Sequence, residues 1–145
     1  MIITDKTIVG PWVANKTTGA WSPETTTTLG LTSHDHLVAG VLYQDYNGVS
    51  LSATIAIEGI MTPAYLAAIF HYPFIYVGAR KIICQIAEGN LKSINLVKKL
   101  GFRKEAQLLD CHPDGSILLY TLSRDNCRFI GERYVKKLPL TATGT

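Results

Sequence analysis

The chain has 145 residues, a length that fits a single compact domain. Its 14 Lys and Arg against 11 Asp and Glu give a net charge of +3, and the basic residues are spread without a dense run, which does not favour a nucleic-acid-binding protein. No apolar stretch approaches the roughly 20 residues that span a bilayer, and no basic segment precedes an apolar core at the N-terminus, so we expect a cytoplasmic protein without a membrane partner.

Two groups of potential metal ligands occur, and neither has the spacing of a metal site. Cys84, Cys111 and Cys127 are an odd number without metal-type pairing, and we interpret them as reduced thiols. The Ser-His-Asp-His sequence at 33–36 lies between two strand candidates and favours an exposed turn over a metal site. We therefore predict no bound metal.

The N-terminal part is rich in β-branched and aromatic residues and predicts a series of strands. Two strands are expected over 7–15 and 24–32. A hairpin is expected from the strands 37–43 and 49–57, because the Asn-Gly dipeptide at 47–48 supplies the positive φ angles of a tight turn.

The strand over 49–57 alternates between two sets of side chains. One face can join the core while the other lines a cleft, and Glu58 ends the strand on the polar side. The apolar face holds Leu51, Ala53, Ile55 and Ile57, and the other holds Ser52, Thr54, Ala56 and Glu58.

A helix is predicted from Thr62 to about Val77. Thr62 is a suitable N-cap, and Pro63 suits the first helical position because its missing N–H has no partner there in any helix. Pro73 must kink this helix or separate its last turn. A parallel crossover into a strand over 80–87 should follow.

The segment from 80 to 123 reads as strand, helix, strand, turn and strand. The helix should run over 91–100 and end at Gly101, since glycine enters the left-handed conformation without a steric cost. A Pro-Asp-Gly turn at 113–115 should join hairpin strands over 103–110 and 116–123. In the helix, Ile94, Val97 and Leu100 form the apolar face, while Lys92, Asn95, Lys98 and Lys99 face water.

Residues 80–128 resemble the C-terminal half of the GCN5-related N-acetyltransferase (GNAT) superfamily, particularly its ribosomal-protein-acetylating branch and short phage-encoded members. The pattern is Asn90, Ser93, then Lys-Leu-Gly-Phe at 99–102, Asp-Gly at 114–115 and Leu-Ser-Arg at 122–124. Tyr-Pro-Phe at 72–74, with Gly78 and Arg80, resembles a run in the short phage-type members. The resemblance covers about the last two thirds of the chain.

The resemblance implies an α/β fold in one domain over residues 1–135, and Pro139 with the small polar residues around it predicts a flexible tail over 136–145. We expect a mixed twisted sheet of about six or seven strands, a kinked central helix and a second, shorter helix. The N-terminal pair of helices usual in the family is not evident. Its absence implies an acceptor cleft that is open or completed by a partner subunit.

The resemblance also implies transfer of an acetyl group from acetyl-coenzyme A to an amine acceptor, in a phage-type protein acting in the host cytoplasm. The family signature of spaced glycines is absent, and Glu58 and Pro63 stand at that place. Asn90 and Ser93 have a second interpretation as an N-cap and a first-turn residue. The expected cofactor contacts are Ile55 and Ile57 for the pantetheine arm, Gly59, Ile60, Met61 and Thr62 for the pyrophosphate, and Asn90 and Ser93 beside them. The acetyltransferase interpretation predicts a cleft between the strands 49–57 and 80–87, with free N–H groups at 59–62 aimed into it.

Two residues are candidates for the chemistry. Glu58 could act as the base if partial burial raised its pKa towards neutrality, or it could be a solvated strand-end glutamate. Tyr120 could protonate the departing thiolate, or it could be a half-buried strand residue. Many family members place a tyrosine as the acid in the preceding helix, where this chain has Val97.

A different class of function stays open. The missing signature and the valine are consistent with a non-catalytic member that serves as a binding or virion-associated module with a homodimeric, phage or host protein partner. Transfer to a nucleobase is weaker, because no basic and aromatic stripe is visible.

Overall fold

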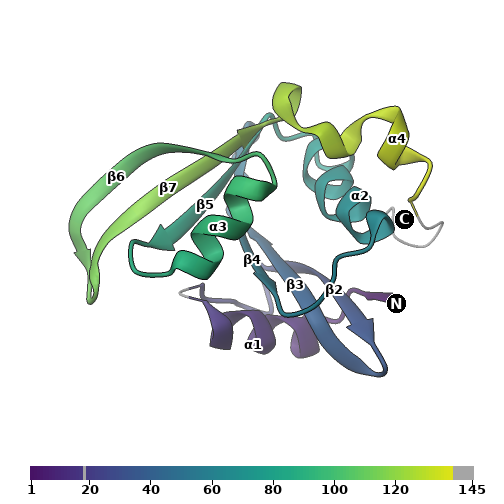
Figure 1. Cartoon of the computed structure of the whole chain (residues 1–145), viewed down its shortest axis with the longest axis horizontal. Coiled ribbons are helices and arrows are strands. Elements are labelled where there is room, and N and C mark those ends of the chain that lie inside the picture. Colours follow the sequence, from purple (N-terminus) through teal and green to yellow (C-terminus); the bar gives the residue numbers. More distant parts are fainter. Residues whose placement is uncertain (18, 139–145) are drawn as a thin grey trace.

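The computed structural model describes residues 1–17 and 19–138 and contains one mixed sheet of seven strands in the order β1-β2-β3-β4-β5-β7-β6 (Figure 1). β4 and β5 are parallel, and the other neighbouring strands are antiparallel. The predicted fold class is confirmed. Most of the tail predicted over 136–145 lies outside the described residues. The strands are β1 (Ile2–Ile3), β2 (Thr27–Ser33), β3 (His36–Gln44), β4 (Ser50–Ile57), β5 (Lys81–Ala87), β6 (Arg103–His112) and β7 (Gly115–Ser123).

Helices cover both faces of the sheet. On one face, α2 and α3 bury a large core with Val41, Leu51 and Ile55. On the other, α1 packs on Leu42 and Ala56, which alternate with that core set along β3 and β4 (Figure 1). Within the described ranges, none of the helices has the length and apolar character needed to cross a bilayer. The helices are α1 (Lys6–Lys16), α2 (Pro63–His71), the π-helical turn η1 (Tyr72–Tyr76), α3 (Leu91–Lys99), the 3-10 turns η2 (Arg124–Asn126) and η3 (Arg128–Ile130), and α4 (Glu132–Val135).

The strand predicted over 7–15 is wrong, because this segment forms the helix α1. Asp5 caps the helix by accepting a hydrogen bond from the Thr7 N–H at 3.0 Å. Val9 and Val13 lie one turn apart and are both fully buried against the sheet. Tertiary packing thus overrides the β preference of the branched residues, and an N-terminal helix is present where none was expected.

The turns of the N-terminal half are confirmed in position but differ in form. The β3–β4 hairpin forms, with positive φ angles at Asp45 (59°) and Gly48 (96°) rather than at Asn47. Asn47 instead accepts hydrogen bonds from two backbone N–H groups of the loop with its side chain. The segment 33–36 is the predicted exposed turn between β2 and β3.

The central helix begins and breaks where the sequence predicts. Thr62 Oγ1 accepts from the Tyr65 N–H at 3.1 Å, and the α-helix gives way to η1 around Pro73. Two buried tyrosine hydroxyls then fix α2 to the sheet: Tyr65 donates to the Leu29 carbonyl at 2.8 Å, and Tyr43 donates to the Ile69 carbonyl. The position of α2 over the strands is therefore set by directed bonds as well as by packing.

The C-terminal half follows the prediction closely. Asn90 caps α3, the apolar face of α3 is buried, and Gly101 has a φ of 102°. β6 and β7 form the expected hairpin, with β6 extending to His112. This hairpin reaches beyond α3 at the left of Figure 1.

α1 lies close to the sheet because two facing strand residues have no side chain. A Cβ at Gly40 would fall 2.5 Å from Val13 Cγ2, and one at Gly30 would fall 2.7 Å from Val9 Cγ2. Both valines are fully buried, so neither can move aside without disturbing the packing.

We therefore expect Gly40→Ala to lower the free energy of unfolding by about 1–3 kcal/mol, because α1 must shift away from the sheet. Urea unfolding followed by circular dichroism measures this change. Gly89→Ala is the matched control, since a Cβ there meets nothing within 4 Å. Equal stability of the two variants would contradict the tight approach of α1.

Candidate active site

The sheet opens between β4 and β5. These parallel strands pair only from Ser50 to Ser52 and from Lys81 to Ile83, and then diverge. Ile55 and Ile57 remain paired to β3 on their other side. The cleft predicted between these strands is confirmed, and within residues 1–17 and 19–138 no strand pairs with the β4 edge that faces it.

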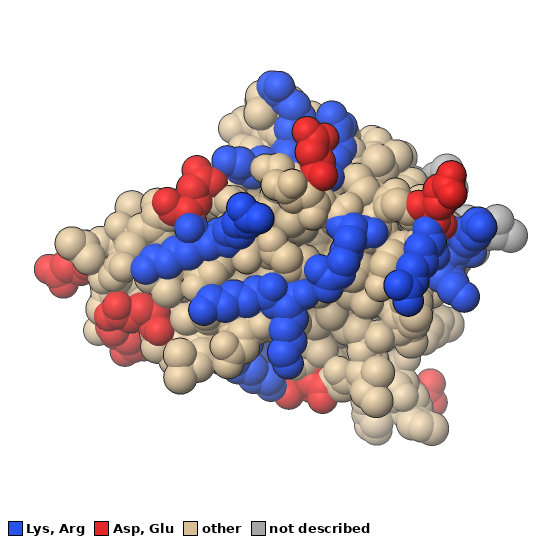
Figure 2. Space-filling model, turned by 45° about the horizontal axis from the view of Figure 1, so that its top comes forward, with Lys and Arg blue, Asp and Glu red and all other residues tan. Residues whose placement is uncertain are grey.

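A cavity of about 310 Å³ lies at the wide end of this opening. Its walls come from the end of α1, from Ile55 to Glu58 at the end of β4, and from one side of α3. Three of its lining residues are lysines, Lys16, Lys92 and Lys99, and one is acidic, Glu58. Figure 2 shows lysine and arginine side chains outnumbering acidic ones across the face that is seen when the top of the molecule in Figure 1 is tilted forward. The cavity therefore favours an anionic ligand.

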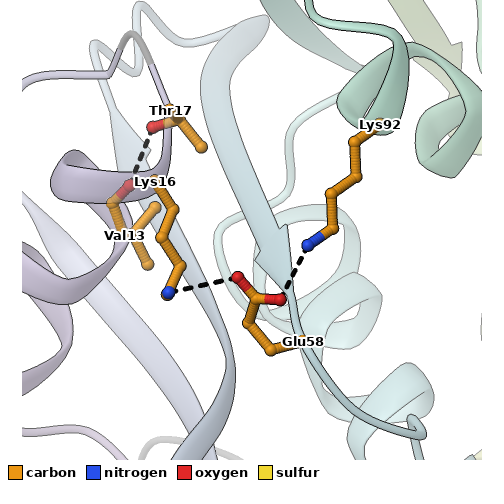
Figure 3. Close-up of polar contacts among 5 residues, drawn as sticks. All are labelled: Val13, Lys16, Thr17, Glu58 and Lys92. Carbon is orange, nitrogen blue, oxygen red and sulfur yellow. Dashed lines mark hydrogen bonds and ion pairs between the residues drawn. The ribbon is translucent and has the colours of Figure 1, made fainter.

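Glu58 bridges two helices across the mouth of the cavity. Its Oε1 lies 3.1 Å from Lys16 Nζ at the end of α1, and its Oε2 lies 2.7 Å from Lys92 Nζ in α3 (Figure 3). The side chain is 39% exposed, and hydrogen bonds from Lys92 and Lys16 lower its pKa below the ordinary value of 4.5. The expectation of a raised pKa at Glu58 is wrong, because two ammonium groups outweigh the burial.

A narrow gap of about 10 Å³ lies deeper between the diverging strands. It is lined by Cys84 and Gln85 of β5, by Thr54 of β4 and by Val97 of α3. Burial raises the pKa of the Cys84 thiol to about 12, so this cysteine is protonated at neutral pH and unsuited to nucleophilic attack. Val97 leaves the gap without an acid at the family's tyrosine position.

Asn90 and Ser93 line both the cavity and the gap. Asn90 Oδ1 accepts a hydrogen bond from the Ser93 N–H at 3.2 Å, which confirms the capping interpretation. The same two residues border the opening, so the structural role and the predicted contact with a ligand are compatible.

The loop before α2 differs from the prediction in one respect. We expected unpaired N–H groups from Gly59 to Thr62, but the Gly59 N–H donates to the Val38 carbonyl at 3.1 Å. Thr62 uses its hydroxyl to cap α2, and Ile60 is 91% exposed. Met61 packs against the core. The β4 side of the cavity ends at Glu58, and these four residues lie beyond it.

Tyr120 is more buried than predicted. It is 3% exposed, belongs to the main core and pairs in register with Cys84. Tyr120 is not among the described residues that line the cavity or the gap. Its role as an acid stays a prediction.

The lining residues that the sequence did not single out as site residues include Lys16, Lys92, Asn95 and Lys99. Lys16 was missed because its segment was interpreted as a strand. The other three lie at intervals of three and four along α3, so they share one side of the helix. A polar helix face of this kind, next to the N-terminus that Asn90 caps, was the signal in the sequence that could have identified these residues.

The ion pairs give Glu58 a defined pH dependence. Because its pKa is lowered in the folded state, the bridge is fully formed above pH 4.5 and is lost as the pH falls through the lower, folded value. We expect the ¹³C signal of the Glu58 carboxyl to titrate below pH 4.5, and Lys92→Met to raise that midpoint. Lys98→Met on the same helix should leave it unchanged. A midpoint near neutrality would contradict the bridge.

No protein-family model matches the sequence, and no curated protein sequence matches it either. Solved structures do match the fold. A variant of the spermidine N-acetyltransferase SpeG from Vibrio cholerae has a TM-score of 0.67 at 12% identity, covering 92% of this chain and 98% of that chain. A GNAT-family acetyltransferase from Bacillus anthracis has a TM-score of 0.58 at 17% identity, covering 83% and 90%.

The Vibrio cholerae spermidine N-acetyltransferase solved in complex with CoA and spermine is also similar, with a TM-score of 0.57 at 18% identity over 70% of this chain and 68% of that chain. Identities this low establish the arrangement of the elements and nothing finer. This chain therefore has the fold of the GNAT acetyltransferases.

Proposed function

We propose that this protein is an N-acetyltransferase that moves an acetyl group from acetyl-coenzyme A to a primary amine. The observation that carries the proposal is the opening between β4 and β5, joined to a cavity lined by three lysines and one glutamate. Such a site suits a ligand with an extended arm and several phosphates. The similarity to a structure that holds CoA and spermine supports both the donor and an amine acceptor.

The residues around the opening fit this donor. Ile55 and Ile57 carry the strand edge along which the pantetheine arm would pair, and Asn90 and Ser93 border it. Lys16, Lys92 and Lys99 would meet the phosphate charge. When bound, acetyl-coenzyme A supplies the activated thioester, and the chain contributes alignment and backbone N–H groups for the developing oxyanion.

The lysines explain how the site could work without the family's glycine signature. Gly59 gives its N–H to Val38, and Pro63 has none, so the start of α2 offers fewer donors than usual. The predicted contacts at Gly59, Ile60, Met61 and Thr62 would then be secondary. We propose that side-chain ammonium groups carry most of the phosphate binding instead.

Glu58 fits a positioning role better than that of a base. It is ionised and held by two lysines, and a carboxylate with a lowered pKa is a weak proton acceptor. It would keep Lys16 and Lys92 facing the cavity while the amine loses its proton to water. The resemblance to short phage-encoded members further supports a phage protein that acts in the cytoplasm of its host.

A second candidate is a non-catalytic member of the same fold that binds a protein partner. The observation in its favour is the hydrogen bond from Gly59 to Val38, which removes a donor expected for the pyrophosphate. Binding of the donor separates the two candidates.

Calorimetric titration with acetyl-coenzyme A tests the proposal directly. We expect micromolar binding, and we expect Lys92→Met and Lys99→Met each to weaken it about fivefold, as for partly exposed ion pairs. Lys98→Met is the matched control, because Lys98 lies on the same helix outside the cavity lining. Absence of binding at millimolar acetyl-coenzyme A would favour the non-catalytic candidate.

Replacing Glu58 by Gln distinguishes its two roles. If Glu58 is an ion-pair partner of the lysines and not a base, the variant should keep turnover within about tenfold and bind acetyl-coenzyme A more tightly, since a carboxylate that competes for the lysines is removed. Loss of about a hundredfold or more in turnover would instead identify a base. Steady-state kinetics with varied acetyl-coenzyme A measures both, with the exposed Glu24→Gln as control.

A further inference from the structure

A second hollow of about 300 Å³ lies on the face of the sheet that α1 partly covers, opposite α2 and α3. Its floor is formed by Ser52 and Thr54 of β4, Gln85 of β5 and Ile117 of β7. The register places these side chains on one face, since Gln44 pairs with Ser52, and Gln85 lies two residues from Ile83, the partner of Ser52. We call this site the acceptor hollow.

The walls of the acceptor hollow are held by side-chain hydrogen bonds. Gln44 Nε2 donates to the Ala20 carbonyl at 2.9 Å and to Thr26 Oγ1 at 2.7 Å, which ties the segment after α1 to the end of β3. His112 closes the opposite side, and its Nδ1 accepts from the Asp114 N–H at 3.1 Å. This bond occupies Nδ1, so Nε2 is the ring nitrogen of His112 that is left to meet a ligand.

The acceptor hollow differs in charge from the cavity beside Glu58, which we call the lysine cavity. Asp45 is the one charged residue in the described lining of the acceptor hollow, which otherwise holds hydroxyl, amide, imidazole and apolar groups. The cavity at the wide end of the opening is lined by three lysines and one glutamate. The acceptor hollow therefore suits a cation, and the lysine cavity suits an anion.

The narrow gap between β4 and β5 lies between the two sites. It shares Thr54 and Gln85 with the acceptor hollow, and Asn90 and Ser93 with the lysine cavity. A molecule in the hollow therefore meets the gap at Thr54 and Gln85, and a molecule in the lysine cavity meets it at Asn90 and Ser93.

We propose that the acceptor hollow binds a small amine that carries a second positive charge, with Asp45 as the anchor for that second charge. The inference rests on the proposed function. The reacting amine must be neutral to attack and would lie at Thr54 and Gln85. Asp45 follows Gln44, the partner of Ser52, so it lies about three residues, roughly 10 Å, from Thr54 along the sheet. A linear diamine spans that distance.

The test uses the full chain, 1,6-diaminohexane as the probe and hexylamine as the singly charged control. In ¹H–¹⁵N NMR spectra the diamine should shift the amide signals of Asp45, Thr54 and Gln85. Asp45→Asn should weaken diamine binding about fivefold and leave hexylamine binding unchanged. Asparagine tolerates the positive φ of 59° at this position, so the fold should persist.

Asp35→Asn is the matched control, because Asp35 is also exposed, has a φ of 64° and lies in another turn. Equal binding of the two amines, or an unchanged affinity in Asp45→Asn, would overturn the proposal, as would shifts confined to the lysine cavity. If acetyl-coenzyme A binds and the diamine does not, the acceptor hollow fails while the proposed function stands. If only the diamine binds, the acetyltransferase function fails and the hollow remains an amine site.

Discussion

The early end of the pairing between β4 and β5 governs this structure. Neighbouring parallel strands normally stay paired, since each buried peptide group left without a partner costs a hydrogen bond. Here three residue pairs hold the strands together before they diverge, and Val97 of α3 fills the wedge from one face. The result is a strand edge inside the molecule whose backbone groups a ligand can pair with. A ligand can approach this edge from either face of the sheet.

The charges are arranged around this opening by segments far apart in the chain. Lys16 ends the first helix, Glu58 directly follows β4, and Lys92 lies in the first turn of α3. The acceptor hollow has Asp45 in its described lining and no lysine or arginine. Two sites of unlike charge beside one opening would suit the proposed reaction between an anionic donor and a cationic acceptor.

Local signals in the sequence were enough for most of the fold. Thr62, Asn90 and Gly101 mark helix ends because capping depends on a few neighbouring residues. α1 was missed because its branched residues prefer strands, and their packing against Gly30 and Gly40 of the sheet overrides that preference. The partners of Glu58 and of the Gly59 N–H lie 21 to 42 positions away, as the residue numbers of Lys16, Lys92 and Val38 show, so no local pattern reports them. The sequence therefore predicted the strand and the helix ends that frame the candidate site, but not the lysines that pair with Glu58.

Because Glu58 already pairs with Lys16 and Lys92, an anion binds to these two lysines in exchange for the carboxylate. An anion that takes Lys16 and Lys92 must displace a carboxylate already bound to both, so its affinity is a difference between two sets of ion pairs. Dissolved salt screens the ion pairs of Glu58 and the ion pairs of the incoming anion alike. Selection among anions then depends on how well each one reaches both ammonium groups at once, so a diphosphate gains over a single small anion of equal charge.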